Sequence, residues 1–385
     1  MHIQYYIEML FIIFALGAID LYRSGVLEAK ERIYENITNY VNLLTQHIQK
    51  EDIIFSESIY RDRVKRIQAL MRDWGIDLLT VLDNENYQYF TGEFRRQPRL
   101  YIPIDGEPMI LVFRGEFEDA SRNTWVKNIH TYGSLHEMMK HVIEYIKQNN
   151  VKTVGFDYEF ALPAFLLERF KMANPTVKVV DARELFMSLR MAKTSEEIEL
   201  MRKAQEIATA GIDAARRVLR EGISEVEVAA EIEYEMRRRG AERFGFPTFV
   251  NSGYRSNCLH GWASRKRIER GELILIDVGP VYMGYSSDMA RTFVLGPQTE
   301  NQRKLIELYI RARREAVNVV KPGVMVSELD NSANRVVSEA GYGEYYVRGI
   351  SHGVGLVFEE TPFPTIFPED KYYRTKGKHD YFNRP

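Results

Sequence analysis

The stretch from Gly271 to Thr292 constrains the fold of this chain more than any other part of the sequence. It begins with an apolar run that reaches Asp277 and is followed at once by a glycine, which is typical of a buried strand that presents a carboxylate at its end. Gly284 then allows the chain to reverse, so Asp288 can return on a neighbouring strand and meet Asp277. Such a carboxylate is costly unless it is paired, and a divalent metal ion is a strong partner for two of them. The stretch therefore predicts a metal-binding hairpin.

Taken alone, the two aspartates leave a simpler alternative open, in which Asp277 caps a turn and Asp288 pairs with Arg291. Two histidines, each followed by a glycine, favour the metal site. His352 stands in the segment SHGVGL after the hairpin, and His260 stands in NCLHGW before it. An imidazole beside two carboxylates suits a transition metal, whereas oxygen ligands alone would suit magnesium or calcium.

The order and wording of these motifs resemble the creatinase/aminopeptidase superfamily, the pita-bread M24 metallopeptidases that include methionine aminopeptidase, aminopeptidase P and prolidase. IDVGPVYMGYSSDMARTF is similar to the segment that carries the first two metal ligands, which would be Asp277 and Asp288. SHGVGL resembles the motif of the histidine ligand, which would be His352. FPTFVNSGYRSNCLHG resembles the segment whose histidine, here His260, contacts the substrate or the tetrahedral intermediate. The likeness runs roughly over residues 54–368.

The stretch NYQYFTG, which ends at Gly92, is similar to the N-terminal domain of prolidase-like members, a domain that methionine aminopeptidase lacks. The resemblance is therefore closer to the Xaa-Pro branch. It implies a metal-dependent aminopeptidase or dipeptidase that hydrolyses an N-terminal bond of a short peptide substrate. It also implies two divalent metal ions, which would be manganese, cobalt or zinc, and a homodimer.

The sequence after His352 departs from the family pattern. In the resembling families two glutamate ligands follow the histidine motif, and no residue of the remaining tail matches either of them. We interpret the remaining acids and the histidine there as surface or turn residues: Glu359, Glu360, Glu369, Asp370, His379 and Asp380. We therefore expect a pita-bread domain that is truncated at its C-terminus and binds metal weakly.

Two other functions stay open. The chain could be a catalytically impaired or non-catalytic pita-bread protein that uses its cleft to bind a peptide or protein partner. It could also be a metal-free, creatinase-like hydrolase of small C–N substrates, although the paired Asp277 and Asp288 count against this reading. Metal content and activity after chelation would separate the three.

The expected fold is α+β and has three parts. We predict a helical N-terminal extension over 1–53, a creatinase-like α/β domain over 54–190, and an incomplete pita-bread domain over 191–385. The apolar run Met9–Ile19 is too short to span a bilayer and lacks the basic segment of a signal peptide. Asp105-Gly106, between two apolar runs, predicts a hairpin. Ser or Thr followed three residues later by Glu predicts helices that begin after Ser134, Thr194 and Ser224.

Composition supports this organisation and narrows the class of partner. A chain of 385 residues with 45% hydrophobic content can bury two full cores. The near balance of 52 Lys+Arg against 54 Asp+Glu argues against nucleic acid or an acidic membrane surface as a partner. The single cysteine, Cys258, excludes an internal disulfide framework and fits a reducing compartment, so we expect a cytoplasmic protein.

Overall fold

The computed structural model describes residues 54–158, 162–349 and 351–362. The predicted N-terminal extension with its apolar run, and four tail residues considered above, lie outside the described residues: Glu369, Asp370, His379 and Asp380. No helix within the described ranges combines the length and the hydropathy that a membrane span requires.

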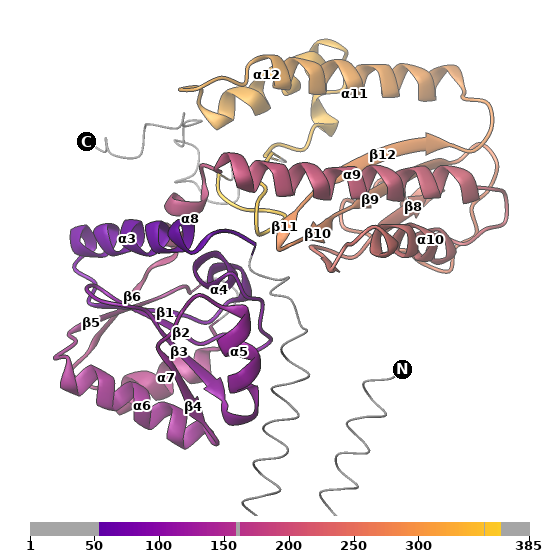
Figure 1. The fold of residues 1–385 in the computed structure, drawn as a ribbon. Coiled ribbons are helices and arrows are strands. Elements are labelled where there is room, and N and C mark those ends of the chain that lie inside the picture. The colour runs from indigo at the N-terminus through magenta and orange to yellow at the C-terminus, as the bar shows by residue number, and fades with distance from the viewer. Residues whose placement is uncertain (1–53, 159–161, 350, 363–385) are drawn as a thin grey trace, which may run out of the picture. The chain divides into compact units, whose positions relative to one another are not determined.

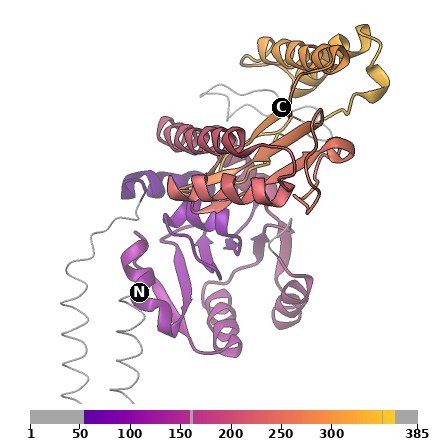
Figure 2. The ribbon, with the colours of Figure 1, turned by 90° about the vertical axis from the view of Figure 1, so that its right-hand side faces the viewer.

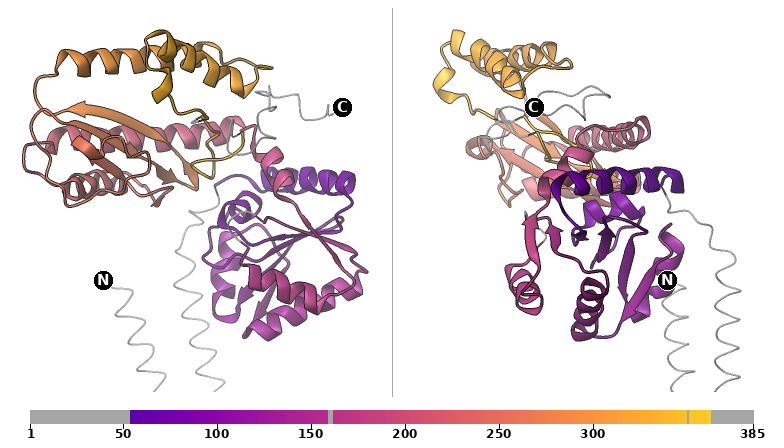
Figure 3. Two further views of the ribbon diagram at one scale, coloured as in Figure 1. Left: turned by 180° about the vertical axis from the view of Figure 1, so that it is seen from behind. Right: turned by 90° about the vertical axis from the view of Figure 1, so that its left-hand side faces the viewer.

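Residues 54–190 fold around a six-stranded mixed sheet with helices on both faces (Figure 1). Its strands are β1 Leu78–Val81, β2 Leu100–Pro103, β3 Met109–Phe113, β4 Ile129–Tyr132, β5 Thr153–Phe156 and β6 Lys178–Asp181, in the spatial order β4-β3-β2-β1-β5-β6. Its helices are α3 Glu57–Trp74, α4 Asn84–Thr91, α5 Phe117–Asn123, α6 Leu135–Gln148, α7 Ala164–Ala173 and α8 Arg183–Arg190. Helices α6 and α7 lie on one face and α3 lies on the other, as Figure 3 also shows. The side chains between the sheet and α6 form a continuous apolar core.

Local sequence signals explain the main turns and helix ends of this part. The hairpin predicted at Asp105-Gly106 is confirmed, because β2 and β3 pair antiparallel and Gly106 has φ +100°. Helix α6 begins after Ser134, whose hydroxyl accepts the Glu137 amide as predicted. In a full capping box the Glu137 carboxylate would accept the amide of Ser134. Here it accepts the amide of Gly133 instead.

Residues 191–362 combine two small sheets with four helices. The strands are β7 Arg243–Phe244, β8 Phe249–Ser252, β9 Leu273–Val278, β10 Pro280–Tyr282, β11 Tyr285–Ser286 and β12 Met289–Val294, in the orders β11-β10-β7 and β12-β9-β8. The helices are α9 Ser195–Val218, α10 Glu225–Arg238, α11 Glu300–Asn318 and α12 Val326–Glu339. The predicted capping boxes at Thr194 and Ser224 are confirmed at the starts of α9 and α10.

Helices α9 and α10 lie side by side (Figure 2), and together they cover one face of the β12-β9-β8 sheet. From β9 this face receives Ile274, Ile276 and Val278, every second residue of the strand, and all three are fully buried. The alternate residues of β9, which include Asp277, therefore project from the opposite face. Helices α11 and α12 also lie side by side and have a small core of their own.

The chain from β9 to β12 is one long hairpin that passes from one sheet into the other. At its tip the chain reverses through Met283 and Gly284, which both have positive φ, at +47° and +84°. The outgoing strand is interrupted at Gly279 and the returning one at Ser287 and Asp288. This interruption places Asp288 just before β12, next to the end of β9.

Candidate functional site

Strand register brings Asp277 and Asp288 together. Asp277 lies opposite Ala290 of β12 and opposite Phe249 of β8. Asp288 precedes Ala290 by two residues, and residues two apart on a strand share a face. Diagonal neighbours on a sheet face are close enough for their side chains to interact. The predicted acid pair is therefore formed on the face that α9 and α10 do not cover.

One oxygen of the Asp277 carboxylate has no hydrogen-bond partner among the described residues. Burial raises the pKa of Asp277, and the charge of Asp288 raises it further, to about 6. The Oδ1 atom of Asp277 is buried and accepts no hydrogen bond within the described residues. A cation between the two carboxylates would remove both their mutual repulsion and this unsatisfied acceptor.

His352 joins the acid pair. Its Nε2 atom lies 3.3 Å from Oδ2 of Asp288. Its Nδ1 atom lies 3.0 Å from the carbonyl oxygen of Gly353, and because a carbonyl can only accept, the proton sits on Nδ1. In the neutral ring Nε2 then carries the lone pair that a metal needs, with the ring orientation fixed by the other nitrogen. Burial acts to lower the pKa of His352, but the hydrogen bond with Asp288 and the charge of nearby groups outweigh it and raise the pKa.

Asp288 does not pair with Arg291, as the simpler alternative for the aspartates requires. Asp288 contacts His352, whereas the guanidinium of Arg291 donates to the carbonyl oxygen of Ala290 at 2.7 Å. In the part of the chain that the structure describes, no group of three or more His, Cys, Asp or Glu side chains is arranged so that it could hold a metal ion. Two carboxylates and one imidazole suit the chemistry of a first-row divalent ion, and their role as metal ligands stays a prediction.

His260 lies in the connection between β8 and β9 and is exposed. The centroid of its ring is 6.3 Å from that of Phe249, and Phe249 is the residue opposite Asp277. His260 is therefore placed beside the face that carries the acid pair. Its role toward a substrate stays a prediction.

An aromatic cluster borders the same face. The ring centroids of Phe246 and Phe249 are 5.4 Å apart, and those of Phe246 and Phe358 are 4.9 Å apart. Phe246 also covers Gly279, where a Cβ atom would lie 2.3 Å from the ring carbon Cε1. The interrupted strand thus passes close under an aromatic ring, and only a residue without a side chain fits there.

Replacing Gly279 with alanine is expected to lower the free energy of unfolding by about 1–3 kcal/mol, because the new methyl group must displace the buried Phe246 ring. Gly115 is the control, since its nearest neighbour to a Cβ is 3.9 Å away and its φ is not positive. Gly115→Ala should change the unfolding free energy by less than about 1 kcal/mol. Urea unfolding of both variants tests this, and equal midpoints would contradict the close packing at Gly279.

The interpretation of Glu360 as a surface or turn carboxylate is wrong. Glu360 is 2% exposed, and its carboxylate receives Nη2 of Arg190 at 2.5 Å and Nζ of Lys193 at 2.6 Å. Its backbone pairs with Gly353 in both directions, which closes a short loop, residues 353–360, that begins directly after His352. Glu360 therefore ties the loop that follows His352 to the end of α8 and to the segment that joins α8 to α9. Glu359 is half-buried, and its charge contributes to the raised pKa of His352.

Sequence reasoning missed these partners, since nothing in the pattern around Arg190 and Lys193 marks them. It assigned Glu197 only as a capping residue. In the structure the Glu197 carboxylate also pairs with Arg63 of α3 at 3.0 Å and accepts the hydroxyl of Tyr285 at 2.8 Å. Only the tertiary contacts of these side chains reveal the second role.

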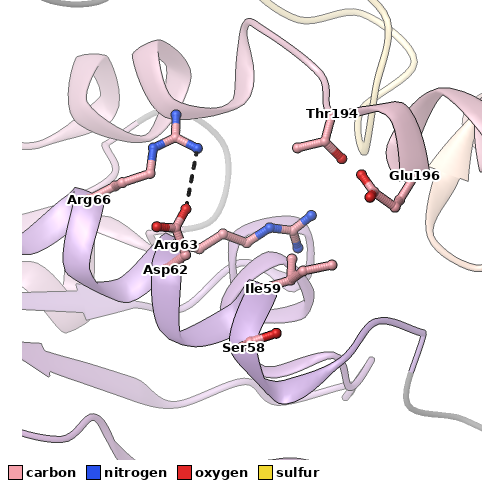
Figure 4. A pocket seen from close by; sticks show the side chains of 7 residues that line it. All are labelled: Ser58, Ile59, Asp62, Arg63, Arg66, Thr194 and Glu196. Carbon is pink, nitrogen blue, oxygen red and sulfur yellow. Dashed lines mark ion pairs between the residues drawn. The ribbon is translucent and has the colours of Figure 1, made fainter.

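A separate hollow of about 220 Å³ lies between α3 and the start of α9 (Figure 4). Its lining residues are Ser58, Ile59, Asp62, Arg63, Arg66, Thr194 and Glu196. It shares no residue with the acid pair, the histidines or the aromatic cluster. Its charged groups are engaged with one another or with neighbours, as in the ion pair of Asp62 and Arg66 at 4.0 Å.

Comparison with known proteins explains this arrangement. The profile of metallopeptidase family M24 matches residues 199–379, and that of the creatinase/prolidase N-terminal domain matches residues 63–192. A Xaa-Pro dipeptidase of Pyrococcus furiosus is 36% identical over 305 residues, which cover 78% of this chain and 84% of the relative. The chain belongs to metallopeptidase family M24. The resemblance to this family that the sequence motifs indicated is thereby confirmed.

Solved structures agree with this M24 assignment. The prolidase of Pyrococcus horikoshii superposes with a TM-score of 0.73 at 34% identity, over 78% of this chain and 84% of that one. The X-Pro aminopeptidase of Thermotoga maritima gives a TM-score of 0.71 at 27% identity, over 81% and 86% of the two chains. The fold is thus a creatinase-type N-terminal domain followed by an M24 domain, of mixed α/β character. The predicted domain boundaries and the truncation stay predictions.

Proposed function

We propose that this M24 chain is a metal-dependent peptidase of the Xaa-Pro dipeptidase or aminopeptidase type. The proposal rests on one observation. Asp277 and Asp288 lie on one sheet face, His352 contacts Asp288, and one oxygen of Asp277 has no hydrogen-bond partner among the described residues. The relatives at 36–37% identity that are named Xaa-Pro dipeptidases support the choice of substrate, a short peptide with proline after the scissile bond.

In this proposal Asp277, Asp288 and His352 would hold divalent ions, with manganese, cobalt and zinc as the candidates. Such ions supply Lewis acidity to the scissile carbonyl and to the attacking water. His260 would donate a hydrogen bond to the carbonyl oxygen as negative charge develops on it. The ring cluster of Phe246, Phe249 and Phe358 would exclude water from one side of the reacting bond and so strengthen these interactions.

Metal content and hydrolysis of the full chain test the proposal together. The protein is loaded with manganese, cobalt or zinc and dialysed, and its metal is counted by elemental mass spectrometry. Hydrolysis of a Xaa-Pro dipeptide is then compared with that of the matched Xaa-Ala dipeptide. Retained metal, faster cleavage of the proline substrate and loss of activity on chelation would together support the proposal.

The alternative is a non-catalytic pita-bread protein that binds a peptide. It is favoured by one observation, namely that no group of three potential ligands among the described residues is arranged to hold a metal ion. Retention of no metal together with no hydrolysis would support this alternative. Hydrolysis that survives exhaustive chelation would contradict both the metallopeptidase and the non-catalytic alternative. It would instead support a metal-free, creatinase-like hydrolase.

A further inference from the structure

Glu225 is a buried carboxylate whose partners lie in the loop that carries His260, and the proposed mechanism gives it no role. It is the first residue of α10 and is fully buried. Its Oε1 accepts the amide and the hydroxyl of Ser252, at 2.8 and 2.9 Å. Its Oε2 accepts the amide and the hydroxyl of Ser264, at 3.0 and 2.7 Å, and Nε of Arg255 at 3.0 Å.

These partners lie at both ends of one loop. Ser252 is the last residue of β8, and Ser264 follows the segment that carries His260. One carboxylate therefore holds the two ends of this His260 loop, residues 252–264, against the N-terminus of α10. The amides of Glu225 and Val226 complete the attachment by donating to the carbonyls of Lys266 and Ser264.

The interior of the His260 loop is fixed from the same point. Arg255, held by Glu225, donates to the carbonyl of Trp262 at 2.6 Å. The side-chain amide of Asn251 donates to the carbonyl of Gly261 at 2.8 Å, and a Cβ at Gly261 would lie 2.5 Å from Asn251 Oδ1. The backbone is thus held on the C-terminal side of His260, directly at the next two residues.

From these contacts we propose that Glu225 is a positioning residue that fixes the His260 loop so that the His260 ring stays beside Phe249 and the acid pair. A hydrogen-bond donor stabilises developing charge effectively only if its position is fixed before the reaction begins. His260 itself is exposed, so its own contacts do little to hold it, and the buried carboxylate supplies the rigidity. The effect of Glu225 on catalysis rests on the proposed function, whereas its effect on the rigidity of the His260 loop does not.

The chain provides its own reporter of loop motion, because its single cysteine, Cys258, is exposed and lies in the His260 loop. A nitroxide attached to Cys258 reports loop mobility by electron paramagnetic resonance, without metal or substrate. Glu225→Gln keeps the shape of the side chain but removes its charge and replaces an acceptor with a donor. We expect a clearly more mobile label in Glu225→Gln.

Glu235→Gln is the matched control, since Glu235 is a buried carboxylate on the same helix whose partners, Arg238 and Arg239, lie outside the loop. It should leave the label mobility unchanged. Ser264→Ala is a milder second variant that removes one hydroxyl donor to Glu225, and it should raise the mobility less than Glu225→Gln. Equal mobility in all four proteins would overturn the inference.

Measurements of kcat test whether Glu225 acts through His260. Misplacement of a catalytic group by about 1 Å can cost about 100-fold in rate, so we expect kcat on a Xaa-Pro dipeptide to fall about 10- to 100-fold in Glu225→Gln. In the double variant with His260→Ala, kcat should be no lower than in His260→Ala alone. Additive losses would indicate a general structural role and overturn the positioning role.

The label-mobility and kcat measurements together distinguish a failure of this inference from a failure of the proposed function. If the unsubstituted protein hydrolyses no Xaa-Pro dipeptide, the proposed function fails and the label mobility alone decides whether Glu225 holds the loop. If hydrolysis is found but the label is equally mobile in Glu225→Gln and in the unsubstituted protein, the proposed function stands and the inference fails.

Discussion

Replacement of Glu360 with glutamine is expected to lower the free energy of unfolding by about 3–5 kcal/mol. The glutamine keeps the volume of the side chain but leaves the guanidinium of Arg190 buried without its counter-charge. Arg190 is 5% exposed, and the other acceptor that the described residues offer its guanidinium, Oδ1 of Asn86 at 2.8 Å, is neutral. An uncompensated buried charge costs far more than the loss of a surface ion pair.

Urea unfolding at pH 7 measures this cost, with Glu107→Gln as the matched control. Glu107 also pairs with an arginine, Arg61 at 2.8 Å, but its side chain is 64% exposed, so the control should lose about 0–1 kcal/mol. A loss in Glu360→Gln no larger than in the control would show that Glu360 does not hold the loop after His352 as described.

The pH dependence of the same difference has a definite sign. Burial acts to raise the pKa of Glu360, but Arg190 and Lys193 outweigh it, and the pKa is lowered below the ordinary glutamate range. A carboxyl group whose folded pKa is lowered stabilises the fold fully above its unfolded pKa, about 4.3. That contribution is lost as the pH falls through the folded pKa. The stability difference between the unsubstituted protein and Glu360→Gln should therefore shrink as the pH is lowered below about 4.

Asp288→Asn is expected to abolish whatever metal binding the chain has and to reduce peptide hydrolysis by at least about 100-fold. The amide no longer offers a charged oxygen beside Asp277, and it also removes the contact of Asp288 with Nε2 of His352. The fold should persist, because the charge of Asp288 raises the pKa of Asp277 and so opposes the ionised pair. Without metal, the variant should unfold at the same urea concentration as the unsubstituted protein or at a higher one.

Thermal unfolding with and without manganese gives a second readout that does not depend on catalysis. A ligand that binds only the folded state stabilises it by about 2.7 kcal/mol at 100 times its dissociation constant. We expect this metal-dependent rise in melting temperature in the unsubstituted protein and none in Asp288→Asn. Asp77→Asn is the control, since Asp77 is a similarly half-buried aspartate that accepts two backbone amides far away in the sequence. Unchanged metal stoichiometry in Asp288→Asn would show that the acid pair is not the metal site.

The sequence by itself determined the features that depend on neighbours along the chain. The apolar run that ends in Asp277 and the reversal at Gly284 sufficed to predict that Asp277 and Asp288 meet on neighbouring strands, because a hairpin brings the residues on either side of its turn together. The capping signatures at Thr194 and Ser224 likewise predicted helix starts that the structure has, since the bonds involved span only three residues. Local motifs also sufficed to identify the family.

Only the tertiary structure decided which charges are buried together. Glu360 looked like a turn carboxylate, yet it is buried against Arg190 and Lys193, which lie about 170 positions earlier in the chain. Glu225 lies in the first turn of a helix that the sequence predicts, but only the structure shows that it closes the His260 loop. Whether a carboxylate faces water or a cation depends on contacts between distant segments. A local pattern does not encode these contacts, because a carboxylate satisfies its charge equally well in water or beside a buried cation.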